Sequence, residues 1–387
     1  MGLSNTKLTK NNQDLHLRNE MIESASKIAE CLSDYEKSQI TTDSVMSWAI
    51  QFGKDAQFML EETAHFIDKI YFSKSKVKEI LEKWILELRE DFDSWDSFLK
   101  DVLFINTQKG KDGEEKSQNV LYHIISDIIK DKTGKDIDYY KNENETKEVY
   151  VYADDILASG KTLREGVVNS IKEYNCMDKR YCCWIICCHS IQKTKTLNSI
   201  VKEVTGSFED SSFRINLEKN FRYKYMIENG RRKGNKNNYE NQLFNCIEPL
   251  DSDLSREVMS SNEMFGSVDS SVDDPVHLLT DSEIGEERFF TNYENRKRYT
   301  ELILKASNML LQEFLKEKSE TDKERSETDK EKDYKIYKPL GITNASDKSL
   351  GLGTLFITWR NIPNNCPYAF WGDINGWKPL CPRNKTK

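Results

Sequence analysis

Apolar residues near the N-terminus recur with the spacing of amphipathic helices. Between Ser73 and Glu90 they stand three or four residues apart, at Val77, Ile80, Leu81, Trp84, Ile85 and Leu88. A similar pattern comes just before it, at Phe58, Met59, Phe66, Ile67 and Ile70. Because positions at this spacing share one face of a helix, both stretches predict helices with one buried side. Residues 1–43 are mostly polar, which predicts a flexible lead-in with one short helix around Met21–Leu32.

In the middle of the chain, short apolar runs alternate with helical stretches. The runs Val102–Ile105, Val149–Ala153 and Tyr181–Cys188 are rich in aromatic, β-branched or cysteine residues, which favours strands. Helical patterns lie between them, at 117–130 and 162–174. This alternation of strand and helix predicts a mainly parallel sheet with helices on both faces. In such sheets, ligands bind beyond the carboxyl ends of the strands.

The last third of the chain changes character three times. Asp251–Asp274 is rich in serine and aspartate, which is typical of a loop. Apolar residues at helical spacing then mark 299–314, and a seven-residue duplication, SETDKER and SETDKEK, follows over Ser319–Lys332. The duplication is almost wholly polar, which predicts a solvated helix extension or a linker. Tyr337–Arg383 is aromatic and rich in turn residues, and it predicts a folded cap.

These changes predict five segments and an α/β fold. The segments are a flexible lead-in over 1–43, a helical region over 44–94, a sheet core over 95–245, an acidic loop with an amphipathic helix and a charged linker over 246–335, and a cap over 336–387 that packs on the core. The predicted architecture is a parallel sheet flanked by helices, with an N-terminal helical region and a C-terminal aromatic cap.

Composition narrows the class of protein. The 387 residues are 37% hydrophobic and 32% charged, with a formal net charge of −8, which disfavours a dominant role in nucleic-acid binding. No apolar run reaches the length of a membrane helix and the N-terminus lacks the apolar stretch of a secretory signal, so we expect no membrane partner. Two adjacent cysteine pairs in the apolar run YCCWIICC fit buried free thiols, and the expected location is a reducing cytoplasm.

The strongest chemical signal lies at the end of the strand that begins at Val149. Two carboxylates, Asp154 and Asp155, come there, and a loop of small residues leads into the next helix. The loop and helix start consist of Ala158, Ser159, Gly160, Lys161 and Thr162. Backbone N–H groups at such a start favour a phosphate dianion, and Gly160 allows the backbone to approach it closely. The preceding carboxylates would accept hydrogen bonds from a ribose diol and help to place Mg²⁺, which prefers oxygen ligands.

Two better-known phosphate motifs do not fit this segment. The Walker A pattern needs a glycine five residues before Gly160, where this chain has Asp155. No GxGxxG pattern follows a strand, so the dinucleotide-binding fingerprint is absent from the sequence. An ordinary strand–turn–helix is the alternative interpretation, in which Asp155 or Ser159 only caps the helix.

The segment resembles the phosphoribosyl-pyrophosphate motif of phosphoribosyltransferases. That motif has an apolar strand, two acidic residues, two apolar residues and a small Ser/Thr–Gly–Lys/Thr–Thr loop, a pattern that this chain matches. The resemblance implies that Asp154 and Asp155 hold the ribose hydroxyls and that Ala158–Thr162 binds the 5′-phosphate. It also implies Mg²⁺ as cofactor and phosphoribosyl pyrophosphate as ligand, with pyrophosphate displaced at the anomeric carbon. Hypoxanthine–guanine members carry an aspartate where this chain has Ala158, so 6-oxopurine salvage loses its base-contacting carboxylate.

The C-terminal pattern narrows the resemblance to one group. It contains Pro339-Leu-Gly, an apolar strand from Gly353, Asn361-Ile-Pro-Asn-Asn, a tryptophan, and Trp377-Lys-Pro-Leu-Cys-Pro-Arg383. This pattern resembles the tail of the PRTase-CE group, phosphoribosyltransferase-like proteins of bacterial conflict and anti-phage systems. The resemblance implies a phosphoribosyltransferase-like sheet, a phosphoribosyl donor or nucleotide as ligand, and a protein partner from the same defence system.

Two further loops are candidates for contact with anionic parts of a ligand. Lys116 and Ser117 follow the first predicted strand, after which phosphoribosyltransferases place their pyrophosphate loop; an ordinary surface loop with Ser117 as helix N-cap is the alternative. The basic stretch 222–236 would close as a lid, contact nucleic acid or form a solvated loop. The charges to test there are Arg231, Arg232 and Lys233.

The sequence leaves three functions open. The first is an enzyme that binds Mg²⁺ with a phosphoribosyl donor or nucleotide, acts at the ribose anomeric carbon and serves as an effector in anti-phage defence. The second is a catalytically inactive nucleotide sensor within a defence complex, which the missing carboxylate at Ala158 favours. The third is a nucleic-acid-binding accessory protein that uses the basic stretch 222–236.

Overall fold

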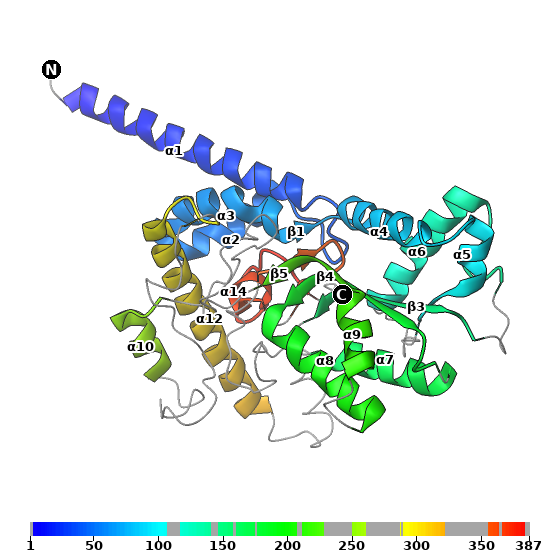
Figure 1. The fold of residues 1–387 in the computed structure, drawn as a ribbon. Helices are drawn as coiled ribbons and strands as arrows, with labels where there is room; N and C mark the ends of the chain where they lie inside the picture. Colours follow the sequence, from blue (N-terminus) through cyan, green and yellow to red (C-terminus); the bar gives the residue numbers. More distant parts are fainter. Residues whose placement is uncertain are drawn as a thin grey trace. The chain divides into compact units, whose positions relative to one another are not determined.

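The chain forms two compact units in a computed structural model (Figure 1). One unit holds Met1–Ser73 and Phe244–Lys387 with Asn229–Gly234, and the other holds Lys74–Glu228 with Asn235–Leu243. We refer to them as the helical unit and the sheet unit. The structure describes residues 3–106, 117–140, 146–157, 160–174, 176–206, 211–227, 250–260, 287, 289–321, 355–363 and 366–383.

Parallel strands form the centre of the sheet unit. In its described residues they are β2 (Val102–Phe104), β3 (Val149–Leu157), β4 (Arg180–His189) and β5 (Phe221–Ile227). They lie in the order β2-β3-β4-β5, so each strand pairs with the next one along the chain. The apolar runs at β3 and β4 suit strands that are covered on both faces, as parallel strands usually are. The parallel sheet predicted from the alternating pattern is confirmed.

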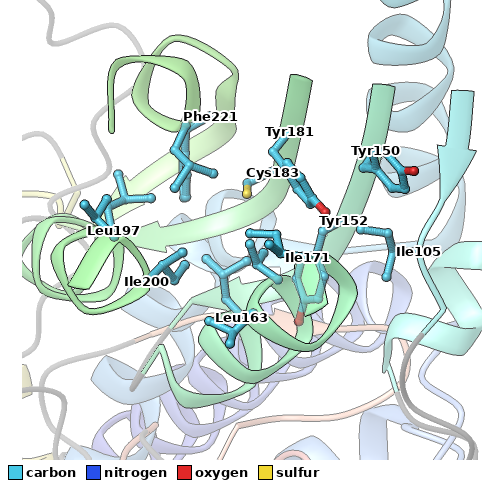
Figure 2. Close-up of a cluster of buried hydrophobic side chains, with 14 of the residues drawn as sticks. Ile105, Tyr150, Tyr152, Leu163, Ile171, Tyr181, Cys183, Leu197, Ile200 and Phe221 are labelled. Carbon is cyan, nitrogen blue, oxygen red and sulfur yellow. The ribbon is translucent and has the colours of Figure 1, made fainter. Parts of the chain in front are cut away.

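Helices cover both faces of this sheet. The described helices of the sheet unit are α4 (Lys74–Arg89), α5 (Trp95–Asp101), α6 (Ser117–Thr133), α7 (Lys161–Tyr174), α8 (Ser190–Thr205) and α9 (Ser211–Lys219). On one face, Ile171 of α7 and Leu197 of α8 belong to the same buried cluster as Tyr181 of β4 (Figure 2). On the other face, Trp84 of α4 contacts Trp184 of β4, with ring centroids 5.9 Å apart. Tyr181 and Trp184 stand three residues apart on one strand and therefore point to opposite layers.

Strand β5 was not predicted from the sequence, which left the basic stretch 222–236 open as a lid, a nucleic-acid contact or a solvated loop. Aromatic residues alternate there with Arg222 and Lys224, a period of two that a strand can satisfy. Arg222 donates from Nη1 to Glu87 Oε2 of α4 at 2.5 Å. On the opposite side, Lys193 of α8 lies over the rings of Phe221 and Tyr223. The strand therefore contacts α4 through Arg222 and α8 through its aromatic side chains.

The helical unit brings together the two ends of the chain. Its described elements are α1 (Leu3–Cys31), α2 (Thr42–Ala49), the 3-10 helix η1 (Ile50–Asp55), α3 (Ala56–Ile70), β1 (Tyr71–Phe72), α10 (Asp253–Ser260), α12 (Tyr293–Thr321), β6 (Ile357–Thr358) and α14 (Tyr368–Trp371). The strands β1 and β6 pair in parallel. On α12, Tyr299 lies 2.8 Å from Thr63 of α3 through their hydroxyl oxygens. The predicted amphipathic helix over 299–314 is confirmed within α12.

Helix α1 is much longer than predicted. The pattern indicated a short helix around Met21–Leu32, whereas α1 begins at Leu3. The segment contains neither glycine nor proline, so the backbone can stay helical through its polar part. Among the side chains described from His16 onward, the buried ones are Ala25, Ile28 and Ala29, at its C-terminal end. The apolar pattern therefore marked the part of the helix where these buried residues lie.

The aromatic C-terminal segment is folded and tied to the N-terminal helices. The indole nitrogens of Trp48 and Trp377 both donate to the carbonyl oxygen of Ala369, each at 3.1 Å. The hydroxyl of Tyr35 donates to Pro382 O at 2.8 Å. These bonds confirm an aromatic cap within the helical unit, whereas the expected packing of the cap on the sheet core stays a prediction. Among the described helices, none has the length and apolar character needed to cross a membrane.

Candidate functional site

The two aspartates lie on strand β3 rather than after it. The apolar run predicted a strand that ends at Ala153, but β3 continues to Leu157, and its pairing with β4 includes Asp154 opposite Ile185 and Leu157 opposite Cys188. The register with β4 includes Asp154 and Ile156, on either side of Asp155, and the charge of Asp155 acts on the Asp154 carboxyl group. Both remain near the carboxyl end of the strand, where parallel sheets bind ligands.

Asp154 is buried and accepts hydrogen bonds at both carboxyl oxygens. Its exposed fraction is 5%. Oδ1 accepts from the Ser117 hydroxyl and from the backbone N–H of Asp155, both at 2.9 Å. Oδ2 accepts from the Tyr152 hydroxyl at 3.2 Å. The Tyr152 oxygen in turn accepts from the side-chain amide of Gln118. The protein therefore supplies donors to the whole carboxyl group.

The electrostatics of Asp154 differ from those of a surface aspartate. Burial, and next the negative charge of the adjacent Asp155, raise the pKa of Asp154 well above its usual range. The Ser117 hydroxyl opposes part of this pKa shift by donating to the carboxyl group. Asp155 is partly exposed, and its own backbone N–H is bound to Asp154. Of the two carboxylates, Asp155 is the one that a ligand in solution can reach.

Gly160 occupies a conformation that favours glycine. Its φ is 72°, in the left-handed region, and a Cβ atom there would overlap Thr196 of α8. Its carbonyl oxygen accepts from Arg164 N at 2.9 Å, so Gly160 directly precedes the first turn of α7. The N–H groups of such a first turn have no acceptor inside the helix and are suited to an anion. Gly160 therefore holds the start of α7 close to α8 without a side chain in between.

The remaining predicted residues divide into two sets. Lys161 and Thr162 are the first two residues of α7. Lys161 is exposed, and its Nζ lies 3.7 Å from Glu165 Oε1, whereas Thr162 is partly exposed. Ser117 is the first residue of α6 and the last residue of the predicted pyrophosphate loop. Its hydroxyl donates to Asp154, so this end of the loop lies next to the acidic pair. The others lie outside the described residues: Ala158, Ser159, Lys116, Arg231, Arg232 and Lys233.

The structure adds site residues that sequence reasoning missed. Tyr152 stands two positions before Asp154 on the same strand, so a period of two would have placed both on one face. Gln118 gave no such signal, because its contact with Tyr152 depends on the tertiary fold. Asn106 follows β2 and donates to Asn119 Oδ1 at 2.8 Å. Its own Oδ1 is buried without a hydrogen-bond partner in the described part of the chain, which leaves an acceptor for a ligand hydroxyl or a water.

The donor set suits Mg²⁺ that arrives with a phosphate ligand. Within the described residues, no group of three or more His, Cys, Asp or Glu side chains is arranged to hold a metal ion. Mg²⁺ is commonly bound by one or two carboxylates together with substrate phosphates and waters, so it does not need such a group. Asp155 would supply the carboxylate oxygen, and Asp154 lies next to it with its oxygens already hydrogen-bonded.

Comparison with known proteins gives one match. The family model described as PRTase-CE matches residues 45–383. No curated protein and no solved structure matches the chain.

Proposed function

Since the chain belongs to the PRTase-CE family and is a phosphoribosyltransferase-like protein, we propose that it binds a phosphoribosyl donor or a nucleotide, together with Mg²⁺, at the carboxyl end of β3. The observation that carries this proposal is the arrangement around Gly160. Its left-handed backbone and close packing on Thr196 place the first turn of α7 directly after a strand that bears Asp154 and Asp155.

Each part of this arrangement has a role in holding a sugar phosphate. The N–H groups at the start of α7 would bind the 5′-phosphate, and the hydroxyl of Thr162 would add a donor. Asp155 would accept hydrogen bonds from the ribose hydroxyls, since it is the more exposed carboxylate of the pair. When bound, Mg²⁺ would offset the negative charge of the pyrophosphate. Fixing the sugar at two points orients its anomeric carbon toward an attacking group.

In the enzyme form of the proposal, a nitrogen base attacks the anomeric carbon as the bond to pyrophosphate breaks. Positive charge develops on the sugar ring in that transition state, and a carboxylate held near the ring stabilises it. The cellular role that we propose is that of a cytoplasmic effector in bacterial anti-phage defence, acting with a protein partner of the same system.

A nucleotide-sensing function is the second candidate. It is favoured by Asp154, whose two carboxyl oxygens are already engaged by protein donors. A nucleic-acid-binding accessory role ranks third, because Arg222 in the basic stretch is engaged with Glu87.

Pyrophosphate release from phosphoribosyl pyrophosphate, assayed with Mg²⁺ and a panel of bases, indicates the enzyme. Binding without turnover indicates the sensor, and salt-dependent nucleic-acid binding that is insensitive to both aspartates indicates the third function.

The direct test is calorimetry of phosphoribosyl pyrophosphate with the full chain, with and without Mg²⁺. We expect Mg²⁺-dependent binding that weakens by roughly tenfold or more in Asp155→Asn, the equivalent of about 1.4 kcal/mol. Asp131→Asn is the matched control, because it removes an exposed carboxylate of the same unit that pairs with Lys78. Equal binding by both variants, or no binding by the wild type to this probe or to common nucleotides, contradicts the proposal.

A further inference from the structure

A chain of buried hydrogen bonds links helix α6 to the acidic pair. The side-chain amide of Gln118 donates to the Tyr152 hydroxyl, and that hydroxyl donates to Asp154 Oδ2. The first residue of the same helix, Ser117, donates to Asp154 Oδ1. Gln118 and Tyr152 are 2% and 1% exposed. Asp154 is therefore held from two sides by one helical turn and one strand neighbour.

The ring of Tyr152 is itself fixed in place. A Cβ atom on Gly166 of α7 would overlap this ring, so the helix passes over it with no side chain between them. Figure 2 shows the ring among side chains that include Leu163 and Ile171 of α7. A tyrosine confined in this way has little freedom to turn its hydroxyl away from Asp154.

The last bond in the chain reaches Asp155. Its backbone N–H donates to Asp154 Oδ1, the same oxygen that accepts from Ser117. Because Asp154 is held by its neighbours, this bond fixes the backbone from which the partly exposed side chain of Asp155 extends. The two adjacent aspartates consequently have different surroundings and are suited to different tasks.

We propose that the acidic pair is divided in function: Asp155 meets the sugar of the ligand, whereas Asp154, Tyr152 and Gln118 are positioning residues that hold Asp155 in its binding orientation. The part that concerns the ligand rests on the proposed function. The part that concerns positioning stands on hydrogen bonds within the protein itself.

Tyr152→Phe is the variant that tests the positioning part, because it removes only a hydroxyl and keeps the packed ring. The matched control is Tyr181→Phe, which removes another buried tyrosine hydroxyl from the same cluster. That hydroxyl lies 2.7 Å from Cys176 Sγ. The full chain is labelled with ¹³C at aspartate carboxyl groups, and Asp154→Asn and Asp155→Asn assign the two resonances. We expect Tyr152→Phe to shift the Asp154 resonance and Tyr181→Phe to leave it in place.

The ligand part uses the same labelled protein with phosphoribosyl pyrophosphate and MgCl₂. We expect the probe to shift the Asp155 resonance more than that of Asp154. Affinity should fall by roughly three- to tenfold in Tyr152→Phe, as for the loss of one buried hydrogen bond. Affinity should stay unchanged in Tyr181→Phe.

A positioning role also predicts partial rescue of Asp154→Asn by Gln118→Glu. In the double variant the amide at position 154 can donate to the Tyr152 hydroxyl, and the carboxyl group at position 118 can accept from it.

The outcomes separate the two claims. An Asp154 resonance that is the same in Tyr152→Phe and wild type overturns the positioning role, whether or not the probe binds. A probe that shifts the Asp154 resonance and spares that of Asp155 overturns the division of tasks. If the wild type binds no probe, the proposed function fails, while the ligand-free comparison of Tyr152→Phe with Tyr181→Phe still decides whether Asp154 is held as described.

Discussion

At the scale of single residues, the candidate site depends on two residues, Asp154 and Gly160, whose properties are set by the side chains around them. Asp154 is an ionisable group in a buried place, and Gly160 is a residue without a side chain beside a buried threonine. Burial of the Asp154 carboxyl group costs free energy. The left-handed backbone at position 160 is tolerated because the residue there is glycine. Such positions are expected where binding geometry takes precedence over stability.

Replacement of Asp154 tests the cost of that carboxylate. The pKa of Asp154 is raised in the folded protein, so above the unfolded value of 3.8 the unfolded chain loses a proton that the folded chain retains. Folding stability from this group therefore falls as pH rises. Asp154→Asn removes this dependence. We therefore expect the difference in Tm between Asp154→Asn and the wild type to rise by about 2–4 °C between pH 4 and pH 8. A change of this size corresponds to about 1 kcal/mol in the free energy of unfolding. A difference that is flat or falls with pH would contradict the buried, raised-pKa carboxyl group.

Replacement of Gly160 separates backbone strain from steric overlap. Gly160 and Gly134 have nearly the same φ, 72° and 71°, but a Cβ at Gly134 has no atom within 4 Å. Gly134→Ala should cost about 1–2 kcal/mol, the strain of a left-handed alanine. Gly160→Ala should cost at least about 1 kcal/mol more, because Thr196 must move. Urea unfolding of both variants gives the comparison, and equal losses would show that α7 and α8 are not closely packed at this point.

At the scale of elements, helix α7 determines the geometry on both sides of the site. Its first turn follows Gly160, and its second turn passes over Tyr152 through Gly166. Three residues separate β3 from α7 in the sequence, so the approach of the helix to the strand places the start of α7 relative to the aspartates. This is a property of the strand–helix pair that no single residue provides.

Gly166→Ala tests the close approach of α7 to β3. In an exposed helix interior, this change would stabilise the protein by up to about 1 kcal/mol. Here the added methyl group meets the Tyr152 ring, so we expect a net loss of about 1–2 kcal/mol in urea unfolding. The loss should shrink in a Tyr152→Val background, where the ring is absent. A stabilised Gly166→Ala variant would refute the contact.

At the scale of the whole molecule, the two units differ in the sequence separation of the residues that contact each other, which is much larger in the helical unit. The sheet unit is assembled from strands that pair in chain order. The helical unit joins residues near the two ends of the chain, for example Trp48 with Ala369 and Tyr35 with Pro382. The family match over 45–383 includes the C-terminal residues of those bonds. The aromatic C-terminal segment is thus part of a core and not a tail added to one.

Trp377→Ala tests this long-range assembly. Trp377 is buried, stacks edge-on with Phe52 and donates to the carbonyl of Ala369. We expect a loss of about 3–5 kcal/mol in the unfolding of the helical unit, as for other buried tryptophans. Amide exchange in α2 should increase with it. Met309→Ala is the control, because Met309 is 50% exposed on α12 and should cost no more than about 0.5 kcal/mol. Similar losses in the two variants would argue against a packed C-terminal segment.

The sequence alone determined the parallel sheet and the order of its strands and helices, and it identified the segment that begins at Val149 as the candidate site. These conclusions follow from hydrophobic periodicity and from turn chemistry between neighbouring residues. Only the tertiary structure decided that Asp154 is buried and that Asp155 is partly exposed. The partners of Asp154 include Ser117, 37 residues away, and burial depends on elements that come together only on folding. For the same reason β5 was missed, because its alternating charged and aromatic residues show their structure only against the helices that they contact. The apolar pattern gave the C-terminal part of α1 and not its full length.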